Sequence, residues 1–182
     1  RPKPDDFQIK EAAELIKKSK KPIIIAGGGV LYSDATDELS DFAKKHNIPV
    51  TQTVMGYSSL KKDHSHYLGA IGGLGSKAAN NLSKETDTAI AIGTKLADFT
   101  TGSWANFENP NFKLVSINAA RFDANKHMAQ AIVGDAKVSL MELSQALGSW
   151  KADDNWYKKS RIELKNWEAY VDKESGPTNQ KL

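Results

Sequence analysis

The apolar residues of this chain follow two alternating patterns, one typical of helices and one typical of buried strands. Residues 9–16 place isoleucine and alanine at the spacing of one helical face, behind a potential N-terminal cap at Asp5. The next run, 23–26, is continuously apolar and rich in β-branched residues, and it lies between a proline and three glycines. Such a run is typical of a strand that is buried on both faces of a sheet.

The same alternation continues along the chain to residue 147. Further helices are expected over 34–46, 78–82 and 136–147, and further strands over 50–54, 88–92, 113–117 and 131–133, while the glycine-rich segment 67–75 is the candidate for a sixth strand. Apolar strands that alternate with helices predict right-handed crossovers and a parallel sheet covered on both faces. The predicted fold class is α/β, a three-layer α/β/α domain with a five- to six-stranded parallel sheet. Such sheets bind ligands at the carboxyl ends of their strands.

The composition changes after Trp150, which predicts a domain over 1–150 followed by a charged helix and linker over 151–182. Within the second part, residues 153–172 are dense in charge, yet Trp156, Leu164 and Trp167 fall on one helical stripe. An aromatic stripe on an otherwise charged helix indicates that this face packs against another protein surface. We favour packing back onto the same domain, and the alternative is that the helix leads into a further domain.

Composition and charge exclude several classes of protein. The apolar fraction of 40% and the charged fraction of 26% are those of a globular protein rather than a disordered chain. The absence of cysteine excludes disulfides, iron–sulfur clusters and a cysteine nucleophile. A net charge of +3 demands neither nucleic acid nor an anionic membrane as partner, and no apolar run approaches the roughly 18 residues of a membrane span. We therefore expect a cytoplasmic protein.

Two glycine-rich motifs are candidates for nucleotide contact. Gly27, Gly28 and Gly29 follow a buried strand, where a dinucleotide fold places its glycines, but Tyr32 stands where the third glycine of the motif belongs. These glycines either contact a nucleotide or form a tight turn with positive φ, and the sequence leaves both open. Residues 73–78 match G-x-G-x-x-A, with Asp98 further on, but follow no convincing strand. They indicate an anion-accepting helix N-terminus more than a dinucleotide fingerprint.

Other candidate chemistry is sparse. His64 and His66 have no third ligand at metal-like spacing, so we expect two solvated histidines and no metal site. The segment 93–112 leaves the carboxyl end of a predicted strand and carries four aromatic residues: Phe99, Trp104, Phe107 and Phe112. Long loops of this kind are usually functional or lie at an interface. The alternative is a small aromatic core of the loop's own.

The order of several motifs resembles a known family. The pieces that carry the resemblance are the helix near residue 8 and the segments Lys21–Val30, Asn47–Val50, Gly69–Gly72, Asp87–Thr94, Leu114–Asn118 and Ile132–Ala136. Together, over residues 8–148, they resemble the Rossmann-like central domain of thiamine-diphosphate-dependent enzymes of the acetolactate synthase and pyruvate oxidase group. Residues 1–4, 27–33 and 96–104 are most similar to the branch that opens a cyclic dione hydrolytically in myo-inositol catabolism. An acetolactate synthase-like carboligase is the alternative parent.

The resemblance implies that the chemistry takes place outside this chain. In the family, the central domain lies between an N-terminal pyrimidine-binding domain and a C-terminal pyrophosphate-binding domain, and the full-length enzyme is expected to be a homo-oligomer. The Gly-Asp-Gly motif and paired asparagines that hold magnesium and pyrophosphate are absent, and Gly134-Asp135-Ala136 closes the last strand instead. We therefore expect thiamine diphosphate and magnesium in the parent enzyme only. This chain should supply no catalytic residue and no metal ligand, and should show no turnover alone.

Some members of the family bind FAD or ADP at the carboxyl edge of this domain. The resemblance implies that the positions lining such a site are Gly27, Gly28, Gly29, Gly75, Thr94 and Asn118. We expect this site to be vestigial, with neither FAD nor ADP bound. The candidates for a substrate-facing wall or a subunit interface are Asp98, Phe99, Thr100, Thr101 and Trp104. The rival functions are a stand-alone nucleotide-binding module, such as a small dehydrogenase, and an interaction module that docks a partner through its Trp156 and Trp167 helix.

Overall fold

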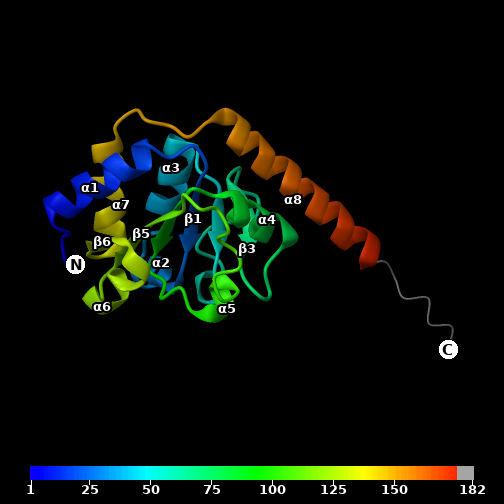
Figure 1. Cartoon of the computed structure of the whole chain (residues 1–182), viewed down its shortest axis with the longest axis horizontal. Helices are drawn as coiled ribbons and strands as arrows, with labels where there is room; N and C mark the ends of the chain where they lie inside the picture. Colours follow the sequence, from blue (N-terminus) through cyan, green and yellow to red (C-terminus); the bar gives the residue numbers. More distant parts are fainter. Residues whose placement is uncertain (176–182) are drawn as a thin grey trace.

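The computed structural model describes residues 1–175 and is built on a single parallel sheet (Figure 1). Six strands pair in parallel in the order β3-β2-β1-β4-β5-β6. Their bounds are β1 Pro22–Ala26, β2 Val50–Gln52, β3 Tyr67–Ala70, β4 Thr88–Ile92, β5 Lys113–Asn118 and β6 Gln130–Val133. The predicted α/β/α fold class is confirmed, and the glycine-rich segment 67–75 contains the sixth strand. The predicted linker residues 176–182 lie outside the described residues.

Helices cover both faces of the sheet and fill the connections at its carboxyl edge. The helices are α1 Asp6–Lys17, α2 Gly28–Tyr32, α3 Thr36–His46, α4 Lys77–Glu85, α5 Asp98–Thr101, α6 Arg121–Ala124, α7 Ala136–Leu147 and α8 Asp154–Glu174, with 3₁₀ turns η1 Val54–Gly56 and η2 Lys126–Met128. One core cluster joins α1, α3 and α7 to the sheet, and a second joins α4 and α8 to the opposite face. Within residues 1–175, none of these helices combines the length and the apolar character that crossing a membrane requires.

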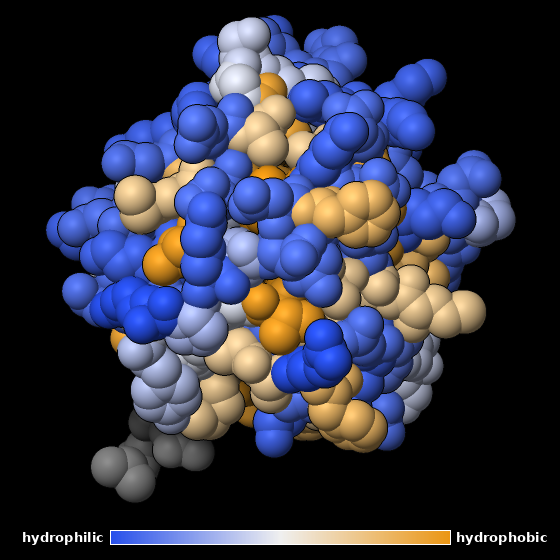
Figure 2. Space-filling view, turned by 90° about the vertical axis from the view of Figure 1, so that its left-hand side faces the viewer, coloured by the Kyte–Doolittle hydropathy of each residue, from blue (hydrophilic) through white to orange (hydrophobic). Residues whose placement is uncertain are grey.

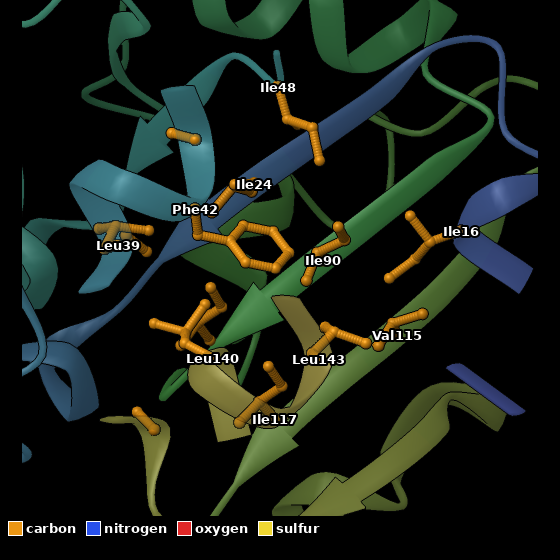
Figure 3. Close-up of a cluster of buried hydrophobic side chains, with 14 of the residues drawn as sticks. Ile16, Ile24, Leu39, Phe42, Ile48, Ile90, Val115, Ile117, Leu140 and Leu143 are labelled. Atoms are coloured by element: carbon orange, nitrogen blue, oxygen red, sulfur yellow. The ribbon is translucent and has the colours of Figure 1, made fainter. Parts of the chain in front are cut away.

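The first core lies where alternate strand residues meet three amphipathic helices (Figure 3). Ile24 and Ile90 project from neighbouring strands toward Phe42 of α3 and Leu143 of α7, and all four are buried. Each fully buried aliphatic or aromatic side chain of this size contributes about 1.5–3 kcal/mol relative to exposure. Because strand side chains alternate between faces, Ile23 and Ile25 join the second core instead.

The second core extends past residue 150 into α8. Trp156 is 4% exposed, and its indole Nε1–H donates to the carbonyl oxygen of Pro22 at 2.8 Å. Leu164, two turns further along, is buried in the same cluster, while Trp167 is only partly buried and stacks on Tyr170. The predicted helix over 153–172 is confirmed, and its first half packs back onto the domain, as favoured. The change of composition at residue 150 therefore does not mark the end of the packed domain.

Several predicted elements differ from the structure at their ends, the helix over 78–82 among them, which runs from Lys77 to Glu85, and two of the differences have a clear local cause. The helix expected over 34–46 begins at Thr36, because Asp34 has a left-handed φ of 50°. A separate short helix, α2, which the sequence did not predict, precedes it. The strand expected over 50–54 ends at Gln52, because the Thr53 hydroxyl accepts the amide N–H of Gly56 at 3.0 Å and turns the chain into η1.

Side chains from the first and last helices close the two edges of the sheet. On the β6 edge, the side-chain oxygen of Gln8 in α1 accepts the amide N–H of Val133 at 2.9 Å. On the β3 edge, Arg161 of α8 donates to the carbonyl oxygens of Ser65 and Tyr67 at 2.6 and 2.7 Å. Unpaired strand edges are templates for pairing with other chains. Each edge is thus satisfied by a helix distant in sequence.

Candidate functional site

A hollow of about 700 Å³ lies at the carboxyl edge of the sheet. It is lined by the segments that follow β1, β2, β4, β5 and β6, including Gly29, Met55, Thr94 and Asn118. The strand order reverses direction between β1 and β4, and open α/β sheets bind ligands at such switch points. This hollow is the candidate site that the predicted fold class requires.

The glycines after β1 allow two connections to cross in direct backbone contact. The amide N–H of Gly29 donates to the carbonyl oxygen of Gly93, after β4, at 2.9 Å. A Cβ at Gly27 would lie 2.4 Å from the oxygen of Gly93, and one at Gly29 would lie 2.5 Å from the Cα of Gly93. Such separations exclude any side chain. Gly93 itself has a φ of 59°, a left-handed conformation that favours glycine.

The glycine turn is therefore explained by close approach and not by positive φ. Gly27 has a φ of −104°, and Gly28 and Gly29 form the first turn of α2. The alternative of a tight turn with positive φ is wrong for these three residues. The sequence could not show the true reason, because Gly93 lies 64 residues beyond Gly29 in the chain.

The groups that a dinucleotide fold offers to its ligand are already paired here. The amide of Gly29 is bound to Gly93, and the amide of Val30 donates to Gly27 at 3.2 Å, so two donors at the start of α2 are occupied. The carboxylate that lines the hollow, Asp123, pairs with Lys126 at 2.7 Å. A dinucleotide fold uses free amides at this helix start for pyrophosphate and an acidic residue about 20 residues further on for ribose, whereas the strand at that distance here, β2 Val50–Gln52, holds no acidic residue. The residues present do not fit FAD or ADP in that manner.

Thr94 and Asn118 lie together in the hollow and hold its walls. The side-chain amide of Asn118 donates to the carbonyl oxygen of Thr94 at 3.3 Å, and its oxygen accepts the amide N–H of Ala120 at 3.0 Å. The Thr94 hydroxyl accepts the amide N–H of Leu96 at 3.2 Å. The Asn118 side chain thus connects the segments after β4 and β5, whereas the Thr94 side chain braces its own segment.

Gly75 lies apart from the other predicted cofactor-binding residues. It does not line the hollow, and its amide closes a tight turn onto Gly72 at 2.8 Å. The motif 73–78 does follow a strand, β3, contrary to the expectation from sequence. Its helix N-terminus is already capped, because the Ser76 hydroxyl accepts the amide N–H of Ala79 at 3.0 Å. No anion is needed there to satisfy that donor.

The predicted wall residues separate into two groups. Phe99 and Thr100 line the hollow, and the Phe99 side chain is 53% exposed. Asp98 is exposed at the start of α5, Thr101 is buried, and neither lines the hollow. Trp104 contacts Phe107 and His127, with ring centroids 5.6 and 4.5 Å apart. Trp104, Phe107 and Phe112 pack against the second core cluster, so these aromatic residues extend that core and do not form a separate core of the loop's own.

Asp135 is not available as a cofactor ligand. It caps α7 by accepting the amide N–H groups of Lys137 and Val138 at 3.1 and 3.3 Å, and it pairs with Arg1 at 3.1 Å. Among residues 1–175, no group of three or more histidine, aspartate or glutamate side chains is placed to hold a metal ion.

The expectation of two solvated histidines is wrong. His66 is 6% exposed, its ring contacts Tyr157 of α8 at a centroid distance of 4.6 Å, and its Nε2 lies 3.2 Å from the side-chain oxygen of Asn47. Burial lowers the pKa of His66 to about 4, with smaller lowering effects from the nearby side chains of His64, Arg161 and Lys44. Burial also lowers the pKa of His64. These histidines belong to the contact between α8 and the β3 edge.

Sequence reasoning missed the apolar side chains around the hollow. Tyr32, Val54 and Met55 line it and are 83%, 52% and 68% exposed. The strand expected over 50–54 would have buried Val54. The sequence does contain a signal for these side chains, because large apolar residues occur in the connections that follow strands, where polar residues are usual.

Comparisons with known proteins agree with the fold. A model of the family described as "Thiamine pyrophosphate enzyme, central domain" matches residues 9–143. A protein of Clostridium perfringens (strain 13 / Type A) named 3D-(3,5/4)-trihydroxycyclohexane-1,2-dione hydrolase is 45% identical over 140 residues, which are 77% of this chain and 22% of the relative. A relative of the same name from Clostridium botulinum (strain Alaska E43 / Type E3) is 42% identical over 166 residues, covering 91% of this chain and 25% of the relative. Another of that name, from Bacillus cereus (strain AH820), is 42% identical over 144 residues, 79% of this chain and 22% of its own length. The chain thus spans a quarter or less of these relatives.

Proposed function

This chain belongs to the thiamine pyrophosphate enzyme family, as a central domain, and we propose that its parent polypeptide hydrolyses a carbon–carbon bond of trihydroxycyclohexane-1,2-dione. The observation that carries the proposal is the identity of 42–45% to relatives of that name, over 77–91% of this chain. The resemblance of residues 96–104 to the same branch of the family supports it.

Within that enzyme, we assign this chain a structural role. Thiamine diphosphate, bound with magnesium by other parts of the polypeptide, would supply the electron sink for carbon–carbon cleavage. Asp135, which follows the last strand, is committed to the start of α7 and to Arg1. The domain contributes a rigid scaffold and, through Phe99 and Thr100, part of a wall. It has no turnover of its own.

The test uses the coding sequence on both sides of this chain and the full-length protein that it specifies. The full-length protein is expected to open the dione only when thiamine diphosphate and magnesium are present, whereas the purified chain has no activity under either condition. Carboligation of pyruvate in place of dione hydrolysis would assign the parent to the acetolactate synthase-like alternative. Light scattering of the full-length protein and cell fractionation test the further proposals of a homo-oligomer and a cytoplasmic location.

We propose that the hollow at the carboxyl edge is a vestigial nucleotide site. The pairing of Gly29 with Gly93, and of Asp123 with Lys126, supports this proposal. Calorimetric titration of the purified chain with FAD, ADP and NAD is expected to show no binding at micromolar concentrations. Micromolar binding of FAD or ADP would contradict the vestigial site, and micromolar binding of NAD would favour the stand-alone module.

A further inference from the structure

Exposure alone does not single out any part of this surface. Figure 2 shows the side that carries α1 and α6, where apolar residues lie scattered among hydrophilic ones. Scattered apolar side chains are normal on a protein surface and indicate no function by themselves. Phe99, which is 53% exposed, is distinguished by the way in which the rest of the molecule holds it. We call Phe99 and Thr100, which both line the hollow, the wall.

The wall rests directly on the backbone that follows β3. The amide N–H of Gly73 donates to the carbonyl oxygen of Phe99 at 3.0 Å. A Cβ at Gly72 would clash with that same oxygen and would lie 2.9 Å from the Cα of Thr100, so no side chain fits between the two segments. The Phe99 ring covers Gly73, where an added Cβ would be 3.2 Å from the ring carbon Cε2. The position of the wall is therefore determined by Gly72 and Gly73.

Asn80 of α4 holds Gly72 by both of its backbone groups. The Asn80 side-chain oxygen accepts the amide N–H of Gly72 at 2.9 Å, and the Asn80 side-chain amide donates to the carbonyl oxygen of Gly72 at 3.0 Å. The same Asn80 oxygen accepts an N–H of the Asn106 side-chain amide at 3.3 Å. Asn106 is buried and follows the wall in the chain. One side chain thus ties the segment against which the wall packs to the segment that comes after it.

The backbone on either side of the wall has a conformation that needs such support. Leu96 precedes the wall with a φ of 49°, and Ser103 and Trp104 follow it with φ of 52° and 70°. Residues with side chains rarely adopt the left-handed region, and they remain in it only where surrounding contacts determine the backbone. Such residues cluster at active sites and ligand-binding sites. The wall is therefore preorganised by contacts with other segments, and the hydrogen bonds of Asn80 are among them.

We propose that Asn80 is a positioning residue for the reaction of the parent enzyme, and that it acts on the wall through Gly72. This inference rests on the proposed function, in which Phe99 and Thr100 form part of a wall. Asn80 does not line the hollow, so it has no direct contact to offer a ligand there. A displacement of about 1 Å in an active site can lower a rate by about 10²-fold. Loss of the Asn80 side chain therefore affects the reaction by moving Phe99.

Asn81, the next residue of α4, provides a matched control, because its side-chain amide donates to Glu163 of α8 at 3.3 Å and not to the supports of the wall. Asn80→Ala, Asn81→Ala, Phe99→Ala and the double variant of Asn80 and Phe99 are made in the full-length protein. Values of kcat and KM for the dione are measured well below the unfolding transition. Asn80→Ala and Phe99→Ala are each expected to lower kcat/KM by about tenfold or more. Asn81→Ala is expected to change it by less than about twofold.

The double variant tests whether Asn80 acts through the wall. If it does, Asn80→Ala lowers kcat/KM by less than about threefold once residue 99 is already alanine, because the effects of residues in one network do not add. Losses that multiply in the double variant would overturn the proposal. So would an Asn80→Ala enzyme with the kcat/KM of the Asn81→Ala enzyme, because a purely structural asparagine lowers the unfolding temperature and leaves the folded enzyme fully active.

Asn106→Ala is a milder variant that removes a single hydrogen bond to Asn80, and it serves if Asn80→Ala does not fold. It is expected to lower kcat/KM in the same direction by a smaller factor. An unchanged kcat/KM in Asn106→Ala together with an unfolded Asn80→Ala would overturn the proposal, since Asn80 would then be needed for folding alone.

Hydrogen exchange at Gly73 reports the position of the wall without an activity assay. In this chain, the Gly73 amide, which donates to Phe99, is expected to exchange about tenfold faster in Asn80→Ala and at an unchanged rate in Asn81→Ala. Equal rates in the two variants would overturn the proposal. A full-length protein that leaves the dione intact would refute the proposed function, whereas the exchange rates would still decide the role of Asn80, so the two proposals fail separately.

Discussion

The backbone crossing at the candidate site predicts a specific ranking of glycine substitutions. At Gly93, an added Cβ would lie 2.4 Å from the Cα of Gly29, more than 1 Å inside ordinary contact, and the residue would also hold a φ of 59°. The left-handed conformation costs a non-glycine residue about 1–2 kcal/mol. Forcing packed backbone apart costs about 1–3 kcal/mol more. Gly93→Ala should therefore lower the free energy of unfolding by about 2–5 kcal/mol.

Two other glycines separate the contributions of conformation and contact. Gly102 has the same φ of 59°, but the nearest atom to its Cβ would be 3.5 Å away, so Gly102→Ala should cost only the conformational part, about 1–2 kcal/mol. Gly29 has no positive φ, but its Cβ would lie 2.5 Å from the Cα of Gly93. Gly29→Ala should therefore cost only the steric part, about 1–3 kcal/mol.

Urea unfolding followed by circular dichroism measures all three variants on this chain. The slope of unfolding with urea must remain constant for the comparison to hold, because a changed slope indicates an altered denatured or native state. If Gly93→Ala loses no more stability than Gly102→Ala, the crossing is not tightly packed. Close approach of the two connections would then not account for the glycines after β1.

Two further predictions concern the contact of α8 with the sheet. Trp156→Ala should lower the free energy of unfolding in urea by about 3–5 kcal/mol, because it empties a buried aromatic site and leaves the Pro22 carbonyl without its partner. Trp167→Ala, at a half-exposed position, should lower it clearly less. Equal losses in the two variants would refute the packing of α8 on the sheet. The His66 pKa of about 4, below the ordinary 6.5, means that the unfolded state takes up a proton before the folded state does. Stability should therefore fall as pH decreases from 6.5 to 4, by at most about 3 kcal/mol. His66→Gln should flatten that part of the stability–pH profile, and a profile parallel to that of the parent sequence would contradict the burial of a neutral histidine.

Local pattern was sufficient for the regular elements. The apolar run 88–92 and the helical stripe 136–147 have the same bounds in the structure, because each ends at a residue that stops it, Gly93 or Gly148. The alternation of such runs predicted a parallel sheet of five to six strands, but not the order of those strands. The short helix α2 was missed because five residues that begin with two glycines carry no periodicity.

The candidate site depended on contacts between distant segments, which local pattern cannot show. The glycines at 27–29 signalled a special turn, but only the approach of Gly93 explains why side chains are excluded at Gly27 and Gly29, and at Gly28 the neighbour is the backbone of Met55. His66 looked polar and exposed because its neighbours in sequence are charged, yet Tyr157 covers it from α8, about ninety residues away. Thr94 and Asn118, which the family resemblance grouped with the glycines at 27–29, both line the hollow. Gly75 was misplaced because its turn folds back on β3.

The side chains that pair with the edge strands determine how short an expressed fragment of this domain can be. Gln8 and Arg161, which satisfy β6 and β3, both lie outside the span 9–143 that defines the family match. A fragment trimmed to that span would expose backbone donors and acceptors on both flanks, and would polymerise or precipitate through strand addition. Truncation experiments should therefore keep residues 5–165 together, a unit longer at each end than the span that the family model matches.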